Sequence, residues 1–220
     1  MRKLLCLAAL LLPWPLRRRV LTHLFGFEIH PSARIGLAWV FPKKLVMEAN
    51  SKIGHLSVCR GLDLVKLGSH ASIGKGNWIC GISRGETKHF CHQHDRVSAL
   101  VMGDHSAVTS RHIIDCTNTV SIGPFSTIAG YRTQILSHSI DLEECRQSSA
   151  PVSVGSFTFV GTDCVLLPGS ALPDRSVLGA KSLLNKAHVT PCWLYGGIPA
   201  RPIRPITGGR YFSRTSGFVF

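Results

Sequence analysis

A strict six-residue period of large aliphatic residues runs through the C-terminal third of the chain. The residues in this phase are Val154, Val160, Leu166, Leu172, Leu178 and Leu184. Four positions after each of the first five comes a small residue, namely Thr158, Cys164, Ser170, Ser176 and Ser182. Neither an α-helix nor a β-strand has this period. A parallel solenoid does, because each hexad forms one short strand with a corner and three hexads close one coil.

The coil geometry predicts which residues stack. Residues three hexads apart should lie side by side, so Val154 should pair with Leu172 and Val160 with Leu178, at about the 4.8 Å spacing of neighbouring strands. The same phase recurs less cleanly upstream, often with Gly after the aliphatic residue. A sandwich of short strands with Gly-rich turns is the alternative, but sandwiches hold no fixed residue period. The sequence therefore predicts an all-β solenoid.

Two stretches break the period, and a third ends it. Residues 80–100 and 139–151 keep no hexad phase, and insertions in a solenoid leave the coils as loops, often at the functional face. After Asn185 the chain is rich in Pro, Gly and Arg. Because Pro lacks a ladder donor, this segment should pack outside or project. The predicted organisation is a helix over 1–27, a β-helix domain over 28–206 with loops at 80–100 and 139–151, and a tail over 207–220.

The charge balance indicates which classes of binding partner are favoured. The chain has 25 Lys and Arg against 12 Asp and Glu, a net charge of +13, which favours anionic partners such as phosphate-bearing cofactors or acidic lipids. No nucleic-acid motif is present, and aromatic residues are not interleaved with basic ones, so we expect no nucleic acid. The 8 Cys form no CxxC pair, which is typical of buried residues in a reducing compartment.

The first 27 residues contain no acidic residue, and their apolar run is too short to span a bilayer. A helix there would place Leu16, Val20, Leu21, Leu24 and Phe25 on one face beside arginines, which predicts an interfacial helix on an anionic membrane. A helix that caps the open end of the solenoid is an alternative compatible with the first. A signal peptide is the other, but Arg17-Arg18-Arg19 does not suit the end of an apolar signal region.

The strongest candidate for chemistry is His138, where the second loop departs. A His at a coil edge can act as a general base near neutral pH, and Asp141 could orient its other nitrogen or bind substrate. His112 and Asp115 lie about one coil before Thr133 and could border this site as substrate contacts, although a structural corner role is the default. The cluster of His89, Cys91, His92 and His94 has no standard zinc spacing, so we expect no metal.

A resemblance to a known family covers nearly the whole chain and is specific in its last third. It is carried by the run SVGSFTFVGTDCVLLPGSALPDRSVLGAKSLLNK followed by YGGIPARPIRPI, and by LLPWPLRRRVL followed by FGFEIHPSARIG. These segments resemble the hexapeptide-repeat acyltransferases, in particular their maltose, galactoside, colanic-acid and polysaccharide O-acetyltransferase branch. The resemblance implies a left-handed parallel β-helix, a homotrimer and active sites between subunits. General connection rules alone would favour the right hand.

By this resemblance, His138 matches the catalytic base, which takes a proton from a sugar hydroxyl that attacks acetyl-CoA. Backbone N–H groups at the coil edge, such as that of Gly161, would meet the oxyanion. The resemblance places the pantetheine arm of the cofactor at Phe159, Gly161, Gly179 and Ala180. Its phosphates need cations, and Lys181, Lys186, Arg201 and Arg204 stand at or after that end of the repeat. Phe159 stands where Trp is usual, and Lys181 stands where Gly is usual.

The expected function is acetyl-CoA-dependent O-acetylation of a sugar on a polysaccharide or lipid-linked glycan precursor. We expect a cytoplasmic protein, peripheral on the inner membrane through residues 1–27. A non-catalytic scaffold subunit and an N-acyltransferase of amino sugars are the alternatives. A γ-type carbonic anhydrase would need three His on zinc between subunits, and no matching triad is present.

Overall fold

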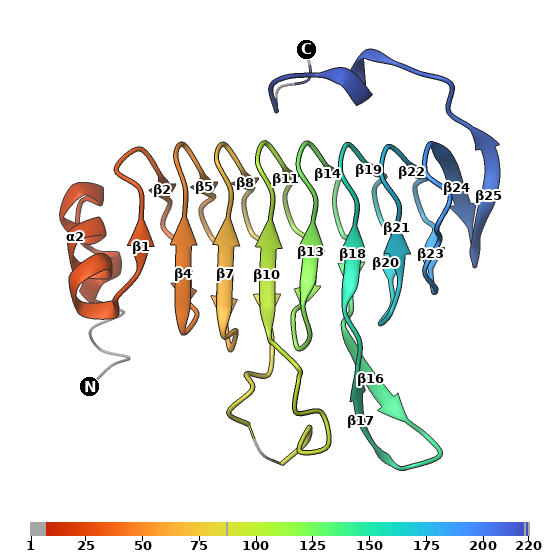
Figure 1. Ribbon diagram of the computed structural model, residues 1–220. Helices are drawn as coiled ribbons and strands as arrows, with labels where there is room; N and C mark the ends of the chain where they lie inside the picture. Colours follow the sequence, from red (N-terminus) through yellow and green to blue (C-terminus); the bar gives the residue numbers. More distant parts are fainter. Residues whose placement is uncertain (1–7, 87, 218, 220) are drawn as a thin grey trace.

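The chain forms a parallel β-helix with three flat faces, each of them a sheet (Figure 1). This computed structural model describes residues 8–86, 88–217 and 219. Sheet A contains β1 (Glu28–Ile29), β4 (Lys44–Met47), β7 (Leu64–Leu67), β10 (Ala99–Met102), β13 (Val120–Ile122), β18 (Val152–Val154) and β21 (Ala171–Leu172). Sheet B contains β2 (Arg34–Ile35), β5 (Lys52–Ile53), β8 (Ser72–Ile73), β11 (Ala107–Val108), β14 (Thr127–Ile128), β19 (Phe159–Val160), β22 (Val177–Leu178), β24 (Trp193–Gly197) and β25 (Ala200–Pro205). Sheet C contains β3 (Trp39–Phe41), β6 (Val58–Arg60), β9 (Trp78–Cys80), β12 (Ile113–Asp115), β15 (Gln134–Ile135), β20 (Val165–Leu166) and β23 (Leu183–Leu184).

The interior is a continuous apolar column built from the six-residue phase. The predicted pairs are confirmed, since Val154 stands beside Leu172 and Val160 beside Leu178 in parallel register. All six aliphatic residues of the C-terminal run are at most 2% exposed, and the small residues between them are buried as well. Burying such a side chain contributes about 1.5–3 kcal/mol. Each coil contacts mainly the coil before it and the coil after it, so burial in this apolar column is what holds successive coils together.

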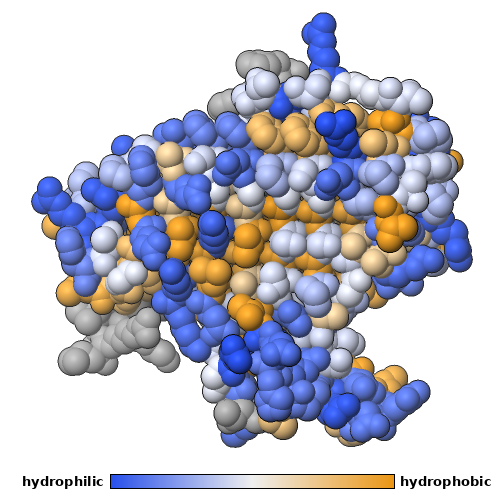
Figure 2. Space-filling model, viewed as in Figure 1, coloured by the Kyte–Doolittle hydropathy of each residue, from blue (hydrophilic) through white to orange (hydrophobic). Residues whose placement is uncertain are grey.

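Two arms leave the column at the corner that leads from sheet C to sheet A (Figure 1). The first arm, residues 81–98, connects β9 to β10. The second arm is a hairpin of β16 (His138–Asp141) and β17 (Arg146–Ser149), which are paired antiparallel. The sequence predicted loops at 80–100 and 139–151, and the second of these is regular structure. The space-filling view shows both arms as mainly hydrophilic, beside an apolar band across the coils (Figure 2).

A helix closes the N-terminal end of the column. α2 (Trp14–Phe25) ends at Gly26, whose left-handed conformation (φ 66°) suits a residue without a Cβ. The apolar helix face that was predicted to contact a membrane is only partly free. Leu21 is buried and Phe25 packs on the core, whereas Leu16 and Leu24 are exposed. Arg17 is buried and donates to the carbonyls of two coil residues, Gly36 at 2.7 Å and Ala38 at 3.0 Å. The capping alternative is therefore what the structure shows, and residues 1–7 lie outside the described residues.

The segment after the hexads packs along the outside, as predicted, but its first part forms regular strands. β24 adds a parallel strand beside β22 and buries Tyr195, and β25 pairs back on β24 although it contains Pro202 and Pro205. Pro is tolerated there because β25 is an edge strand. The tail then turns back along the outside of sheet B through a short 3-10 helix, η1 (Arg210–Ser213) (Figure 1).

Candidate active site

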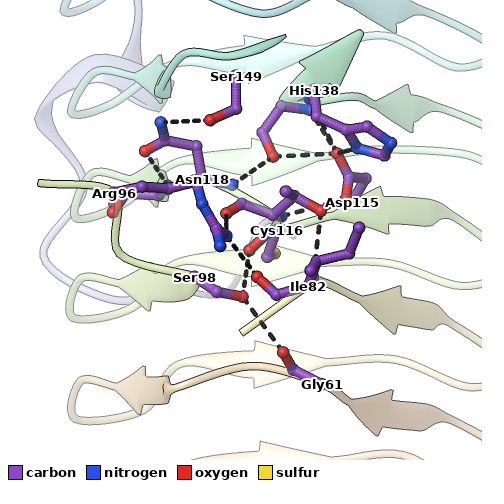
Figure 3. Close-up of polar contacts among 12 residues, drawn as sticks. Gly61, Ile82, Arg96, Ser98, Asp115, Cys116, Asn118, His138 and Ser149 are labelled. Carbon is purple, nitrogen blue, oxygen red and sulfur yellow. Dashed lines mark hydrogen bonds and ion pairs between the residues drawn. The ribbon is translucent and has the colours of Figure 1, made fainter. Parts of the chain in front are cut away.

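The two arms flank a pair of side chains on neighbouring coils. β12 ends at Asp115 and pairs with β15, and His138 follows β15 at the same corner. The Nδ1 atom of His138 lies 2.6 Å from Oδ2 of Asp115 (Figure 3). The His138 side chain is 35% exposed and that of Asp115 only 14%. The carboxylate is thus held inside the corner, and the imidazole faces outward from it.

The Asp115 carboxylate is fixed by several donors. Oδ2 accepts the backbone N–H groups of Ser137 and His138, at 2.9 and 3.1 Å, together with the Ser137 hydroxyl at 3.0 Å. Oδ1 accepts the hydroxyl and backbone N–H of Thr117, at 2.6 and 3.1 Å. An ionised carboxylate accepts only, so Nδ1 of His138 must donate to it. In the neutral ring, Nε2 then carries a free lone pair.

This geometry sets the protonation of both groups. The hydrogen bond to Asp115 raises the pKa of His138 above its ordinary value of 6.5, and partial burial and the charge of Arg96 oppose this shift only in part. Burial by itself would raise the pKa of Asp115. The hydrogen bonds from His138 and Thr117 outweigh burial and hold that pKa below its ordinary value of 3.8.

Asp141 does not orient His138, which corrects the sequence-based expectation. It lies at the far end of β16, opposite Arg146, and its Oδ1 accepts the backbone N–H groups of Glu143 and Glu144, both at 3.1 Å. A short Asp side chain at a turn commonly makes such local bonds. Asp115, which was expected to contact substrate, takes the orienting role.

His112 is a structural corner residue, which confirms the default expectation. Its side chain is buried, so its other expected role, as a substrate contact, is wrong. It is 1% exposed, its Nδ1 accepts the backbone N–H of Thr133 at 3.1 Å, and its Nε2 lies 2.8 Å from Oγ1 of Thr109. Burial lowers the pKa of His112 to about 4, so the ring is neutral. The expected stacking of this turn on Thr133 is confirmed.

The residues assigned to the cofactor lie apart from His138 on this chain. Gly161 precedes β20 and Ala180 precedes β23, so both stand at the entrance to sheet C, whereas His138 follows the exit of β15 in the same parallel sheet. Lys181 occupies the same corner in the left-handed region (φ 57°), which accounts for Gly being the easier residue there. The remaining cations, Lys186, Arg201 and Arg204, are exposed.

Two backbone donors assigned to this region are already used. The N–H of Gly161 donates to the Leu178 carbonyl and that of Gly179 to the Tyr195 carbonyl, both at 2.8 Å. Gly161 therefore cannot supply an oxyanion hole, and its role is close packing, since a Cβ there would lie 2.6 Å from the Ala180 nitrogen. Within the described chain, the Ala180 N–H makes no hydrogen bond.

Phe159 lies on the outer face of sheet B beneath the tail. Its ring meets Tyr211 edge-on at 5.9 Å, and the Tyr211 hydroxyl donates to the Thr158 carbonyl at 2.8 Å. Its strand neighbour Val177 lines a hollow of about 300 Å³ together with Arg204 and residues of the tail. Phe159, the expected aromatic contact of the cofactor, and Arg204, a candidate for binding its phosphates, therefore lie on the same face of the β-helix.

Sequence reasoning missed three residues of the first arm. Phe90 is buried with its ring edge-on to His138 at 6.3 Å, Arg96 is buried beneath it, and Gln93 bonds to Ser149 of the second arm. No period or motif marks them. Asp115 could have been found from coil stacking alone, because it ends the strand directly beside the one that precedes His138.

Neither a metal cluster nor a spanning helix is found in the part of the chain that the structure describes. His89, Cys91, His92 and His94 are exposed on the first arm, and no group of three or more His, Cys, Asp or Glu among described residues could hold a metal ion. Among residues 8–86, 88–217 and 219, no helix is long and apolar enough to cross a membrane.

Comparison with known proteins places this site in context. No protein-family profile matches the chain. The galactoside O-acetyltransferase of Escherichia coli strain K12 is 33% identical over 92 residues, which cover 40% of this chain and 45% of the relative. The N-acyltransferase AntD of Bacillus cereus, solved with a dTDP-amino sugar and coenzyme A, superimposes with a TM-score of 0.54 over 87% of this chain and 90% of AntD, at 15% identity. The polysialic acid O-acetyltransferase OatWY gives 0.53 over 84% and 87%, at 18% identity.

The chain is similar to the hexapeptide-repeat acyltransferases in both sequence and fold. Like those of the hexapeptide-repeat acyltransferases, its β-helix is left-handed. The matches span half or less of the length of the curated relatives.

Proposed function

We propose that the chain is an acyltransferase that moves an acetyl group from acetyl-CoA to a hydroxyl of a sugar, on a polysaccharide or a lipid-linked glycan precursor. The observation that carries the proposal is the 2.6 Å contact between His138 Nδ1 and Asp115, which leaves Nε2 free at an exposed edge. A base of this kind can take a proton from an acceptor near neutral pH. A purely structural scaffold would have no need for this arrangement.

In the proposed reaction, His138 Nε2 removes the proton as the acceptor oxygen attacks the thioester carbonyl. The tetrahedral intermediate collapses with loss of the CoA thiolate, and the imidazolium returns its proton to that sulfur. The neighbouring Asp115 carboxylate stabilises the imidazolium while it exists. No covalent enzyme intermediate is required. Alignment of the two substrates supplies much of the rate.

Acetyl-CoA is proposed to bind along the entrance of sheet C. The unbonded N–H of Ala180 is a donor for an amide carbonyl of the pantetheine arm. Lys181, Lys186, Arg201 and Arg204 are exposed cations near that end of the column and suit the phosphates. The CoA complex of AntD supports this choice of donor by likeness of fold.

We propose that the protein acts as a homotrimer with sites between subunits. Support comes from the separation of His138 and the Ala180 corner across sheet C, because one chain alone does not bring them together. The outer face of sheet C also carries exposed apolar side chains on β12 and β9, beyond β15, where Ile113 and Trp78 are 48% and 50% exposed. Light scattering of the purified protein would test this directly, and a monomer that retains activity would contradict it.

A peripheral position on the cytoplasmic face of a membrane is proposed from the N-terminal segment. Leu11, Leu16 and Leu24 are exposed there, and the protein is strongly basic. Flotation with anionic liposomes is expected to retain the protein. Deletion of residues 1–27 should abolish flotation, and an unchanged result would sink this part of the proposal.

The deciding experiment is a melting curve with and without excess acetyl-CoA, followed by an acyl-transfer assay. A ligand at about 100 times its Kd stabilises the folded state by about 2.7 kcal/mol, so a raised melting temperature is expected. Thiol release should then depend on added sugar. A panel of hydroxyl and amino sugars separates O-transfer from the N-transfer favoured by the likeness to AntD. Absence of both binding and transfer would favour the scaffold alternative.

A further inference from the structure

The two arms are joined by a reciprocal pair of hydrogen bonds. Gln93 Nε2 donates to the Ser149 carbonyl at 3.0 Å, and the Ser149 hydroxyl donates to Gln93 Oε1 at 2.6 Å. The two residues are 56 positions apart in sequence, on different arms. Ser149 ends β17 and stands directly opposite His138 in the hairpin register. A contact that restrains Ser149 on β17 therefore also restrains His138, its partner on β16 and the proposed base.

The hairpin has few other supports. It contains two strands of four residues, and its outward side chains Ile140 and Leu142 are exposed. A two-stranded hairpin is marginally stable by itself. At its base, Asn118 Nδ2 donates to the Ser149 hydroxyl at 3.1 Å, and the Asn118 backbone N–H donates to the Ser137 hydroxyl at 2.8 Å (Figure 3). The same Ser137 hydroxyl donates to Asp115, so Gln93 joins a network that ends at the carboxylate orienting His138.

The first arm is anchored to the coils around Arg96. Arg96 is 4% exposed and donates to the carbonyls of Ile82, Ser83 and Thr117. Its guanidinium lies 4.3 Å from the ring centre of Phe90, which is buried and faces His138. Because Arg96 anchors this part of the arm to the coils, the nearby contact of Gln93 can restrain the hairpin of the second arm.

We propose that Gln93 is a positioning residue that latches the second arm to the first and so keeps His138 aligned with Asp115. This role rests on the proposed acyl transfer, in which His138 is the base. Gln93 suits the latch because its amide both donates and accepts, matching the carbonyl and hydroxyl of Ser149. Loss of the latch frees the hairpin and with it the orientation of the imidazole. A misplacement of about 1 Å can lower a rate about 10²-fold.

The kinetic test compares Gln93→Ala with His94→Ala, an exposed neighbour on the same arm. Gln93→Ala is expected to lower kcat about tenfold to a hundredfold with the KM for acetyl-CoA unchanged. The rise of activity with pH should also move to lower pH, because a misaligned Asp115 raises the pKa of His138 less. Gln93→Glu keeps the acceptor but loses the donor, so it should fall between wild type and Gln93→Ala. If Gln93→Ala behaves like His94→Ala, the latch is overturned.

A second test needs no activity. Arg146 is exposed at the end of the hairpin, so trypsin cleavage after it, followed by mass spectrometry, reports how often the hairpin opens. Gln93→Ala should raise this rate about tenfold, the effect of losing one or two hydrogen bonds, while His94→Ala and cleavage within the coils stay unchanged. Equal rates in Gln93→Ala and wild type would overturn the latch. A wild-type protein without acyl transfer would instead remove the proposed function and leave this test standing.

Discussion

The coils from Val152 to Leu184 contain no insertion, whereas those between Cys80 and Val152 carry both arms. In the uninterrupted coils each hexad buries one aliphatic residue, and parallel strands stack in register without a break. In the arms, order comes from specific polar contacts, such as Arg96 with three carbonyls and Gln93 with Ser149. Regular burial of aliphatic side chains stabilises the coils, whereas individual hydrogen bonds position the arms and the proposed base. Substitutions in the uninterrupted coils should therefore lower stability, whereas substitutions in and beside the arms should lower activity.

The largest expected effect is on activity, at His138. His138→Ala removes the proposed base, and general-base catalysis typically contributes about 10²–10⁴-fold, so kcat should fall by that factor. The melting temperature should fall only slightly, because Asp115 loses the His138 hydrogen bond but keeps those from Ser137 and Thr117. Steady-state thiol release from acetyl-CoA measures the loss, with the exposed neighbour Ser139→Ala as the control. A variant with normal turnover would assign the base to another group.

A buried hexad residue should lose stability instead. Leu166 is fully buried, so Leu166→Ala should lower the free energy of unfolding by about 2–5 kcal/mol through lost burial and the cavity left behind. Its outward neighbour on β20 provides the control, and Val165→Ala should cost less than about 1 kcal/mol. Urea unfolding measures both. Equal costs would contradict a column held by its inward residues.

Asp115→Asn should change the pH dependence. Asp115 raises the pKa of His138, and the neutral ring is the active form, so wild-type activity should rise with pH through a midpoint above 6.5. Loss of the carboxylate charge lowers that pKa, so the rise should move to lower pH. We expect kcat to fall about tenfold to a hundredfold, as for other groups that orient a functional His. A pH–kcat profile identical to wild type would separate Asp115 from the base.

The smallest effect is expected at an exposed corner of the coils. Arg132 and Asp163 form an ion pair at 3.5 Å, with the Arg132 side chain 75% exposed. Arg132→Ala should change the free energy of unfolding by less than about 1 kcal/mol, because water and salt screen such pairs. Urea unfolding at low and high salt gives the value. A larger loss would mean that corner charges also hold the scaffold.

The solenoid and its stacking were readable from the sequence, because a six-residue period is local and repeats. Val154, Val160 and their successors specify inward positions whatever the rest of the chain does. The position of His138 followed from the same logic, since it stands where the period stops. The residue that orients His138 did not follow from the period, because the sequence favours Asp141, three residues away, over Asp115.

Only the tertiary structure decided these remaining points. Asp115 meets His138 because coils stack, so residues 23 positions apart become neighbours. Gln93 and Ser149 meet because both arms leave the β-helix at the same corner. Neither arm has a residue period from which this contact could be predicted. Burial of Arg17 against coil carbonyls likewise made α2 a cap of the column, a role that its sequence alone did not decide. A repeat determines its own packing through local burial, whereas contacts between insertions depend on where the scaffold brings them together.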